Sequence, residues 1–287
     1  MKWGGSTEEI CSTEHLDLMG HPSIFSLLIN PGSIITAIFG LMKIIPLSEG
    51  AFTVDATKKF VPFHVGQDAM TDRSRGSLLV EIQPFVVITD NDIILLDTGL
   101  GQKNEQGQFQ LFKNLSEHGL NADDITKVIM SHLHKDHVSG LINPYTGQLS
   151  FENATHYIQK QELEYALQGG SVSYHTEMLE LLKSADNVVL SEAEQGTLGE
   201  GIRYEITGAH SKFHRVIWIE DGDEIAFFGG DDAPQLSQMR TRFAAKYDFD
   251  GKKAMQLREK WLKEGAEGGW KFLFYHDIKT PIHQFNE

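Results

Sequence analysis

Four side chains of types that commonly bind metal ions occur within six residues, at His132, His134, Asp136 and His137. In extended backbone, side chains two residues apart point to the same side, so His132 and His134 could bind one ion together. Asp136 and His137 would face a neighbouring position once the chain turns into a loop. Imidazole and carboxylate ligands suit a borderline divalent ion such as zinc. The spacing therefore predicts a metal site.

Short strands and helices must position this motif, which directly follows an apolar strand predicted over residues 127–131. Further strands are predicted at 77–89, 92–97, 201–207, 215–219, 224–229 and 271–275. Helical patterns cover 108–118, 159–168, 176–184 and 252–264. Strands that come in runs, with helices between the runs, predict an α+β fold of two packed sheets with helices outside. Neither repeats nor a Gly/Ser-rich linker divides the sequence, so a single domain over residues 1–287 is expected.

The composition restricts the partners of this chain. With 40 acidic and 25 basic residues, its formal net charge is −15. This balance argues against nucleic-acid binding, because phosphate contacts need clustered lysines and arginines.

The single cysteine, Cys11, excludes an internal disulfide and a Cys-rich zinc site. A reducing compartment and hence a cytoplasmic location are expected.

The least polar stretch lies near the N-terminus, where residues 18–42 contain no Asp, Glu, Lys or Arg. Two prolines, an asparagine and a glycine interrupt it and leave apolar pieces at 24–29 and 34–41, each too short to span a membrane. The first ten residues lack the apolar run of a signal peptide. The stretch is therefore a buried strand pair, a homodimer interface over residues 24–45 or a contact with a membrane surface, and no stable membrane insertion is expected.

The motif from His132 to His137 resembles the His-x-His-x-Asp-His signature of the metallo-β-lactamase superfamily. The resemblance extends over about residues 77–283, through further segments at strand ends. These segments are Ile94–Gly99, Thr207–His214, Phe227–Asp231 and Phe272–His276. The resemblance implies a four-layer αββα sandwich with metals at one edge between the sheets. It leaves residues 1–60 as an N-terminal extension that packs on this domain.

Carried over one position at a time, the resemblance implies a site for two divalent ions, zinc before manganese or iron. The implied ligands are His132, His134 and His210 for the first ion, Asp136, His137 and His276 for the second, and Asp231 as the bridge between them. The adjacent Asp232 is the alternative bridge. Asp97 is expected to hydrogen-bond the metal-binding loop, and His214 is expected to be structural.

The resemblance also implies a hydrolase, in which a hydroxide between the two metals attacks the substrate. Asp231 or Asp136 would pass a proton to the leaving oxygen. Among the branches of the superfamily, N-acyl homoserine lactonases and methyl-parathion-hydrolase-like enzymes are the most similar, on residues 46–55 and 268–276 and on chain length. A small-molecule lactone, ester or phosphotriester is therefore expected as substrate, a lactone first. A glyoxalase-type thioesterase, a mono-iron dioxygenase and a non-catalytic metal-binding module are the alternatives.

Two features bear on the substrate pocket. Lactonases of this branch often carry a tyrosine three residues after the bridging aspartate, where this chain has Pro234. The side chains that could substitute for it are Tyr145, Tyr174 and Tyr275. Four phenylalanines are either an apolar acyl pocket or ordinary core. They are Phe25, Phe39, Phe60 and Phe63.

Overall fold

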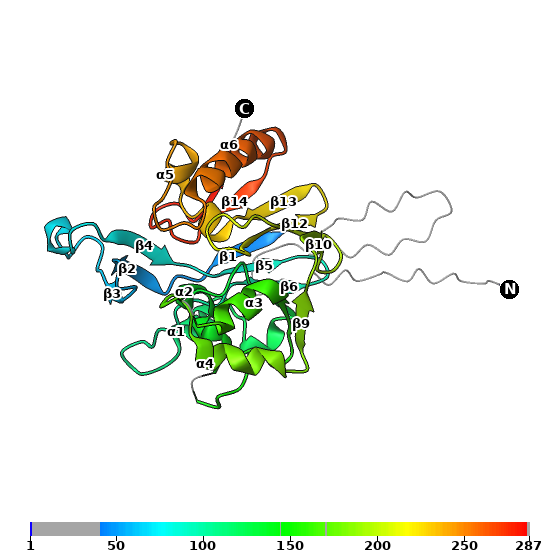
Figure 1. The fold of residues 1–287 in the computed structure, drawn as a ribbon. Coiled ribbons are helices and arrows are strands. Elements are labelled where there is room, and N and C mark those ends of the chain that lie inside the picture. The colour runs from blue at the N-terminus through cyan, green and yellow to red at the C-terminus, as the bar shows by residue number, and fades with distance from the viewer. Residues whose placement is uncertain (2–40, 144, 170, 286–287) are drawn as a thin grey trace. The chain divides into compact units, whose positions relative to one another are not determined.

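The computed structural model describes residues 1, 41–143, 145–169 and 171–285. Two six-stranded sheets form the centre of the unit that spans residues 39–287 (Figure 1). The first sheet has the order β1 (Lys43–Pro46), β5 (Phe85–Ile88), β6 (Ile93–Leu96), β7 (Lys127–Ile129), β8 (Thr155–Gln159) and β9 (Val188–Ser191). The second has the order β10 (Gln195–Thr197), β11 (Ile202–Ile206), β12 (Arg215–Asp221), β13 (Glu224–Phe228), β14 (Lys271–Leu273) and β15 (Ile282–Gln284).

A smaller sheet of three strands extends from one edge of this unit (Figure 1). Its central strand β2 (Gly50–Val54) pairs with β3 (Phe60–Pro62) and β4 (Leu78–Ile82), both antiparallel. Because β4 runs on into β5 of the first sheet, the small sheet is held beside the end of the two large ones.

Successive side chains of a strand point to opposite faces of its sheet, so the apolar side chains of one strand lie in two different layers. In β12, Val216 and Trp218 lie in the cluster that contains Trp261 of helix α6 (Gly251–Glu267), whereas Ile217 and Ile219 lie in the cluster between the two sheets. This two-sided burial explains why β12 is an almost continuous apolar run rather than a polar–apolar alternation.

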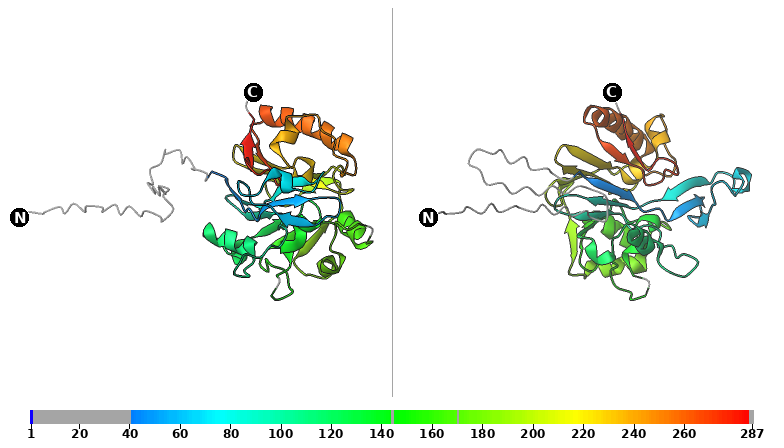
Figure 2. Two further views of the ribbon diagram at one scale, coloured as in Figure 1. Left: turned by 90° about the vertical axis from the view of Figure 1, so that its left-hand side faces the viewer. Right: turned by 180° about the vertical axis from the view of Figure 1, so that it is seen from behind.

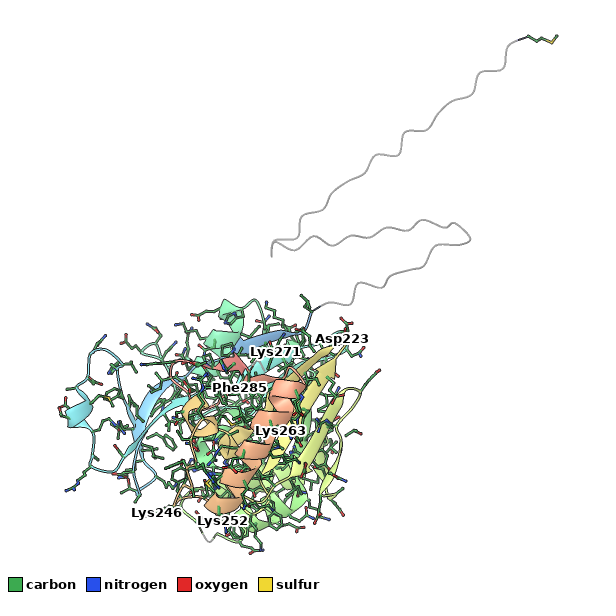
Figure 3. The ribbon with its side chains drawn as sticks, turned by 90° about the horizontal axis from the view of Figure 1, so that it is seen from above. Asp223, Lys246, Lys252, Lys263, Lys271 and Phe285 are labelled. Carbon is green, nitrogen blue, oxygen red and sulfur yellow. The ribbon has the colours of Figure 1, made fainter. Side chains whose placement is uncertain are left out.

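Helices cover the outer face of each large sheet (Figure 2). The helices are α1 (Gln110–Glu117), α2 (Lys135–Val138), α3 (Lys160–Leu167), α4 (Thr176–Leu179), α5 (Leu236–Met239) and α6 (Gly251–Glu267). Side chains of α1, α3 and α4 pack on the first sheet, and those of α6 pack on the second. Figure 3 shows α6 along the outside of the second sheet, with the exposed Lys252 and Lys263 on it. The predicted αββα sandwich is thereby confirmed.

Several predicted boundaries were wrong. The strand predicted at 77–89 is two strands, because Pro84 has no N–H to donate and the chain changes partners there, from β2 to β1 and β6. The helix predicted at 176–184 is α4 followed by a 3-10 turn, Glu180–Lys183. The strands that were not predicted include β1, β3, β8, β9, β10 and β15. Helix α6 extends the predicted 252–264 by one residue at its start and three at its end.

The N-terminal predictions fall largely outside the described residues, which omit 2–40. The apolar segment 24–45 is described only from residue 41, where it leads into β1. The homodimer interface, the extension over 1–60 and the single domain over 1–287 therefore stay predictions. Among the helices in the described part of the chain, none is both long and apolar enough to cross a membrane.

Candidate metal centre

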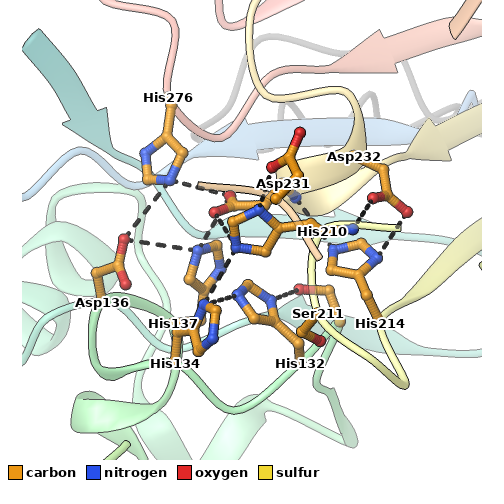
Figure 4. Close-up of polar contacts among 12 residues, drawn as sticks. His132, His134, Asp136, His137, His210, Ser211, His214, Asp231, Asp232 and His276 are labelled. Carbon is orange, nitrogen blue, oxygen red and sulfur yellow. Dashed lines mark hydrogen bonds and ion pairs between the residues drawn. The ribbon is translucent and has the colours of Figure 1, made fainter. Parts of the chain in front are cut away.

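The seven predicted ligands come from the segments that follow four strands, with Asp136 and His137 in the short helix α2. His132, His134, Asp136 and His137 follow β7, His210 follows β11, Asp231 follows β13 and His276 follows β14. Strands β6 and β7 are parallel, as are β13 and β14, so the ends of neighbouring strands lie at the same edge of their sheet. Figure 4 shows these side chains converging from both sheets. The structure thus brings all seven together.

One group consists of three imidazoles and one carboxylate. Nε2 of His132 lies 2.9 Å from Nδ1 of His134, which lies 3.1 Å from Nε2 of His210. Oδ2 of Asp231 lies 3.1 Å from the same His210 nitrogen. These four donor atoms lie within 4.8 Å of one another, so they could hold one ion. Three nitrogens and one oxygen are a donor set that suits zinc.

A second group shares Asp231 with the first. Oδ2 of Asp136 lies 3.5 Å from Nε2 of His276 and 3.6 Å from Nε2 of His137. Oδ1 of Asp231 lies 2.9 Å from the same His276 nitrogen and 3.2 Å from the His137 nitrogen. The two oxygens of Asp231 therefore face different groups, which is the arrangement that a bridging carboxylate requires.

Two atoms in the second group fit a cation particularly well. His137 Nε2 and Asp231 Oδ1 are buried and make no hydrogen bond within the described part of the chain. Buried polar atoms are normally paired, because leaving one unpaired costs about 1–3 kcal/mol. A divalent ion at this position would satisfy both atoms, so the residues present fit the metal that the sequence predicts.

Comparison with known proteins agrees with this geometry. Residues 80–276 match the family model of the metallo-beta-lactamase superfamily, which is more than half of the chain. The chain belongs to this superfamily. Its membership agrees with the expectation of a metal-dependent hydrolase. No curated protein matches the chain.

Solved structures share the fold of this superfamily member at low sequence identity. A probable metal-dependent hydrolase from Staphylococcus aureus is 21% identical, with a TM-score of 0.66 over 87% of this chain and 98% of that one. AidC, described as a dizinc quorum-quenching lactonase in complex with a product, is 20% identical, with a TM-score of 0.66 over 87% and 92% of the two chains. The hydrolase AbOPH is 21% identical, with a TM-score of 0.65 over 86% and 90%.

In this superfamily member, groups outside the seven fix the orientation of the histidines. Nδ1 of His137 lies 2.7 Å from Oδ2 of Asp97, and Nδ1 of His276 lies 2.6 Å from the backbone oxygen of Glu81. Each contact leaves Nε2 turned toward the centre. Asp97 also accepts hydrogen bonds from the backbone N–H and hydroxyl of Ser131, so it holds the motif loop as expected.

Asp232 and His214 support the backbone rather than facing the centre. Oδ2 of Asp232 lies 3.0 Å from Nδ1 of His214, and Oδ1 accepts a hydrogen bond from the backbone N–H of His210. Nε2 of His214 accepts a hydrogen bond from the backbone N–H of Asp231. Gly230 makes room for this contact, since a Cβ there would lie 2.7 Å from that nitrogen. Of the adjacent aspartates, Asp231 is therefore the one that faces both groups.

Glu162 is a buried carboxylate that sequence reasoning missed. It lies on α3, and Oε1 accepts hydrogen bonds from the hydroxyl of Tyr174 at 3.0 Å and from the backbone N–H of Leu133 at 3.3 Å. The hydroxyl of Ser211 donates to the same carboxylate. Leu133 and Ser211 each adjoin a predicted ligand, so Glu162 joins the two ligand-bearing loops.

Electrostatics favours the protonation state that metal binding needs at three of the seven proposed ligands. Burial, reinforced by neighbouring imidazoles, holds the pKa values of His132 and His134 well below the usual range. Burial alone would raise the pKa of Asp231, but His276, His137 and His210 outweigh it and hold that pKa well below its usual range. At neutral pH, His132 and His134 are therefore neutral and Asp231 is ionised, as ligands must be. At His137, His210 and His276, burial alone would lower the pKa, but the nearby Asp231 carboxylate instead raises it above the usual value.

A pocket opens beside the candidate metal centre. Five of the proposed metal ligands line it. The other lining residues are Val54, Lys58, Phe60, Leu78, Leu79, Val80, Lys135, Ser173, Pro234, Gln235, Gln238 and Tyr247. Of the phenylalanines considered for an acyl pocket, Phe60 lines it and Phe63 is buried elsewhere, whereas Phe25 and Phe39 lie outside the described residues.

None of the three predicted tyrosines lines this pocket. The hydroxyls of Tyr145, Tyr174 and Tyr275 donate to Gly107 O, Glu162 and Asp136 O respectively. Tyr247 lines it instead, with its ring centroid 6.1 Å from that of His210. Nothing in the local sequence around Tyr247 indicated this, because the loop before α6 reaches the site only through tertiary packing.

Proposed function

We propose that this protein is a dinuclear metal-dependent hydrolase that opens a lactone or a related ester or phosphotriester. The observation that carries the proposal is the position of Asp231, whose two oxygens face two separate groups of histidines. His132, His134 and His210 would hold one ion, and Asp136, His137 and His276 the other. Two divalent ions, zinc before manganese or iron, would supply a nucleophilic hydroxide at neutral pH and polarise the bond under attack.

The residues of the chain would have distinct parts in the reaction. Asp97 and the backbone oxygen of Glu81 keep the Nε2 atoms of His137 and His276 aimed inward. Asp231 and Asp136 are the carboxylates within reach of the reacting centre, and either could carry a proton to the leaving oxygen. The apolar side chains of the small sheet would exclude water from one side of the substrate.

The lactone preference is supported by the fold shared with AidC, which is described as a dizinc lactonase. Since identity to that chain is 20%, the substrate is inferred from the likeness together with the pocket. The pocket places apolar side chains of the small sheet beside the proposed ligands, and the acyl part of a substrate could lie against them.

Elemental analysis of the purified protein, followed by a panel of acyl lactones, aryl esters, thioesters and phosphotriesters, tests the proposal. Two ions per chain and hydrolysis of a lactone or ester are expected. His132→Ala should lose metal and hydrolysis together. Full activity in that variant would refute the two-metal site, and one iron per chain with oxidation of a sulfur substrate would identify a dioxygenase instead.

A further inference from the structure

The pocket beside the candidate metal centre is lined by positively charged side chains, whereas the chain as a whole is acidic. Among its lining residues outside the seven proposed ligands, the charged ones are Lys58 and Lys135, and none is a carboxylate. The chain as a whole carries a net charge of −15, so cations at the pocket run against the overall balance. A cleft lined by one sign of charge raises the local concentration of ligands of the opposite sign.

Lys58 is held at this pocket in a strained position. It lies in the turn between β2 and β3, with its backbone N–H donating to Asp55 O and with a φ of 57°. A left-handed conformation at a residue other than glycine costs of order 1–3 kcal/mol and persists where the surrounding structure enforces it, often at functional sites. The ammonium nitrogen lies 5.9 Å from the ring centroid of Tyr247, which lines the same pocket from the loop before α6.

Among the residues that the structure describes, no carboxylate pairs with the ammonium group of Lys58. Within the described residues, it makes no ion pair, although the side chain is half-buried. Three other half-buried lysines are paired: Lys127 with Asp92, Lys160 with Glu192 and Lys271 with Glu224. The fourth, Lys135, lines the same pocket as Lys58 and likewise makes no ion pair with a described residue. A partly desolvated cation favours an anionic partner, because charge-assisted hydrogen bonds are stronger than neutral ones. The pocket itself is where such a partner would lie.

One wall of the pocket is apolar. Val54, Phe60, Leu78 and Val80 come from the three strands of the small sheet. A ligand that fits must therefore combine an apolar body with a negative charge. We propose that the substrate is an ester or lactone carrying a carboxylate or phosphate group, which pairs with Lys58 while the apolar part of the substrate lies on the small sheet. This inference rests on the proposed hydrolase function and narrows its substrate class.

Matched esters test the proposal. Metal-loaded protein would be assayed with 4-nitrophenyl monoesters of glutarate, adipate and pimelate, and with the uncharged pentanoate, hexanoate and heptanoate of equal chain length. At least one charged ester should be preferred over its uncharged match. Lys58→Met should lower kcat/KM for that ester by about 10- to 100-fold, mainly through KM, and leave the uncharged esters within about twofold.

Lys59→Met is the matched control, because Lys59 is exposed and does not line the pocket. It should leave both kinds of ester unchanged. A further ester, 4-nitrophenyl 6-phosphonohexanoate, separates the two anions, because it has as many methylenes as the pimelate monoester. A Lys58-dependent preference for it over the pimelate monoester assigns a phosphate-bearing substrate, and the reverse assigns a carboxylate.

Two results would overturn the inference while leaving the hydrolase proposal intact. They are hydrolysis of every uncharged ester at least as fast as its charged match, and an equal effect of Lys58→Met on both kinds. By contrast, two bound ions with no turnover of any ester or lactone would overturn the proposed function, and this inference with it.

Discussion

His210 and Asp248 form a contact in which Nδ1 of the imidazole lies 2.9 Å from Oδ1 of the carboxylate. Both side chains are almost fully buried. Asp248 lies in the loop before α6, and the backbone N–H of the next residue, Phe249, donates to His210 O. The loop before α6 therefore contacts His210 both through the Asp248 side chain and through a backbone hydrogen bond. The Asp248 carboxylate keeps Nε2 of His210 turned toward the metal centre.

Removal of this contact should weaken metal binding without removing a ligand. Asp248→Ala should lower affinity for the metal by about 10- to 100-fold, because the ring of His210 loses its orientation. Competition with a chelator of known affinity measures the effect. Asp223→Ala, in the exposed turn between β12 and β13, is the control. Unchanged affinity in Asp248→Ala would show that the contact has no orienting part.

The adjacent aspartates should respond differently to substitution. Asp231→Ala should reduce metal content from two ions to one or none, because both proposed sites lose a donor. Asp232→Asn should keep its metal and lose about 1–3 kcal/mol of stability, since Asp232 holds Thr207, His214 and the backbone of His210. Metal analysis and denaturant unfolding of both variants decide the point. The opposite pattern would make Asp232 the bridge.

Substitution of Glu162 should loosen two loops at once. Glu162→Ala leaves the donors of Tyr174, Leu133 and Ser211 without their acceptor and should cost at least about 2 kcal/mol of unfolding free energy. Metal affinity should fall with it. Tyr174→Phe removes one donor only and should cost about 1 kcal/mol. Equal effects of the two substitutions would argue that Glu162 does not join the loops.

Acid should destabilise the protein partly through His156. Burial lowers the pKa of this histidine from 6.5 to about 4, and both ring nitrogens lack a hydrogen-bond partner in the described residues. Since the folded pKa lies below the unfolded one, stability is complete above about pH 6.5 and is lost as the pH falls toward 4.

The loss should approach, at most, about 1.4 kcal/mol per pH unit within that window. Denaturant unfolding of wild type and His156→Leu at several pH values isolates this contribution, because the other titrating groups are common to both. As the pH falls from 7 to 4, wild type should lose more stability than His156→Leu, because only wild type has to protonate a buried histidine. A difference that stays constant from pH 7 to pH 4 would refute the assignment.

The sequence predicted the parts of the fold and the site that depend on local pattern. The His132–His137 motif is contiguous, and it indicated a metal site by itself. The resemblance to the metallo-β-lactamase superfamily then implied that His210, Asp231 and His276, each after a strand, would converge on it. Asp248, Glu162 and Tyr247 could not be found in this way. They lie on a loop or a helix whose position is fixed by packing at a distance along the chain, with no spacing that marks them.

The missed strands have a similar explanation. All three residues of β10 are exposed, so no apolar alternation marks them. β8 continues directly into α3, and the helical pattern obscured the boundary. Pro84 lies within an apolar run, and the change of pairing partner at that residue is visible only once β1 and β2 are in place.

Each group of proposed ligands draws donors from both halves of the sandwich, with His132, His134, Asp136 and His137 beside the first sheet and His210, Asp231 and His276 beside the second. Bound ions would therefore cross-link the halves and contribute their binding energy to folding. A cell that runs short of the metal would then lose the protein to unfolding and proteolysis, so metal supply would set its lifetime as well as its rate of turnover.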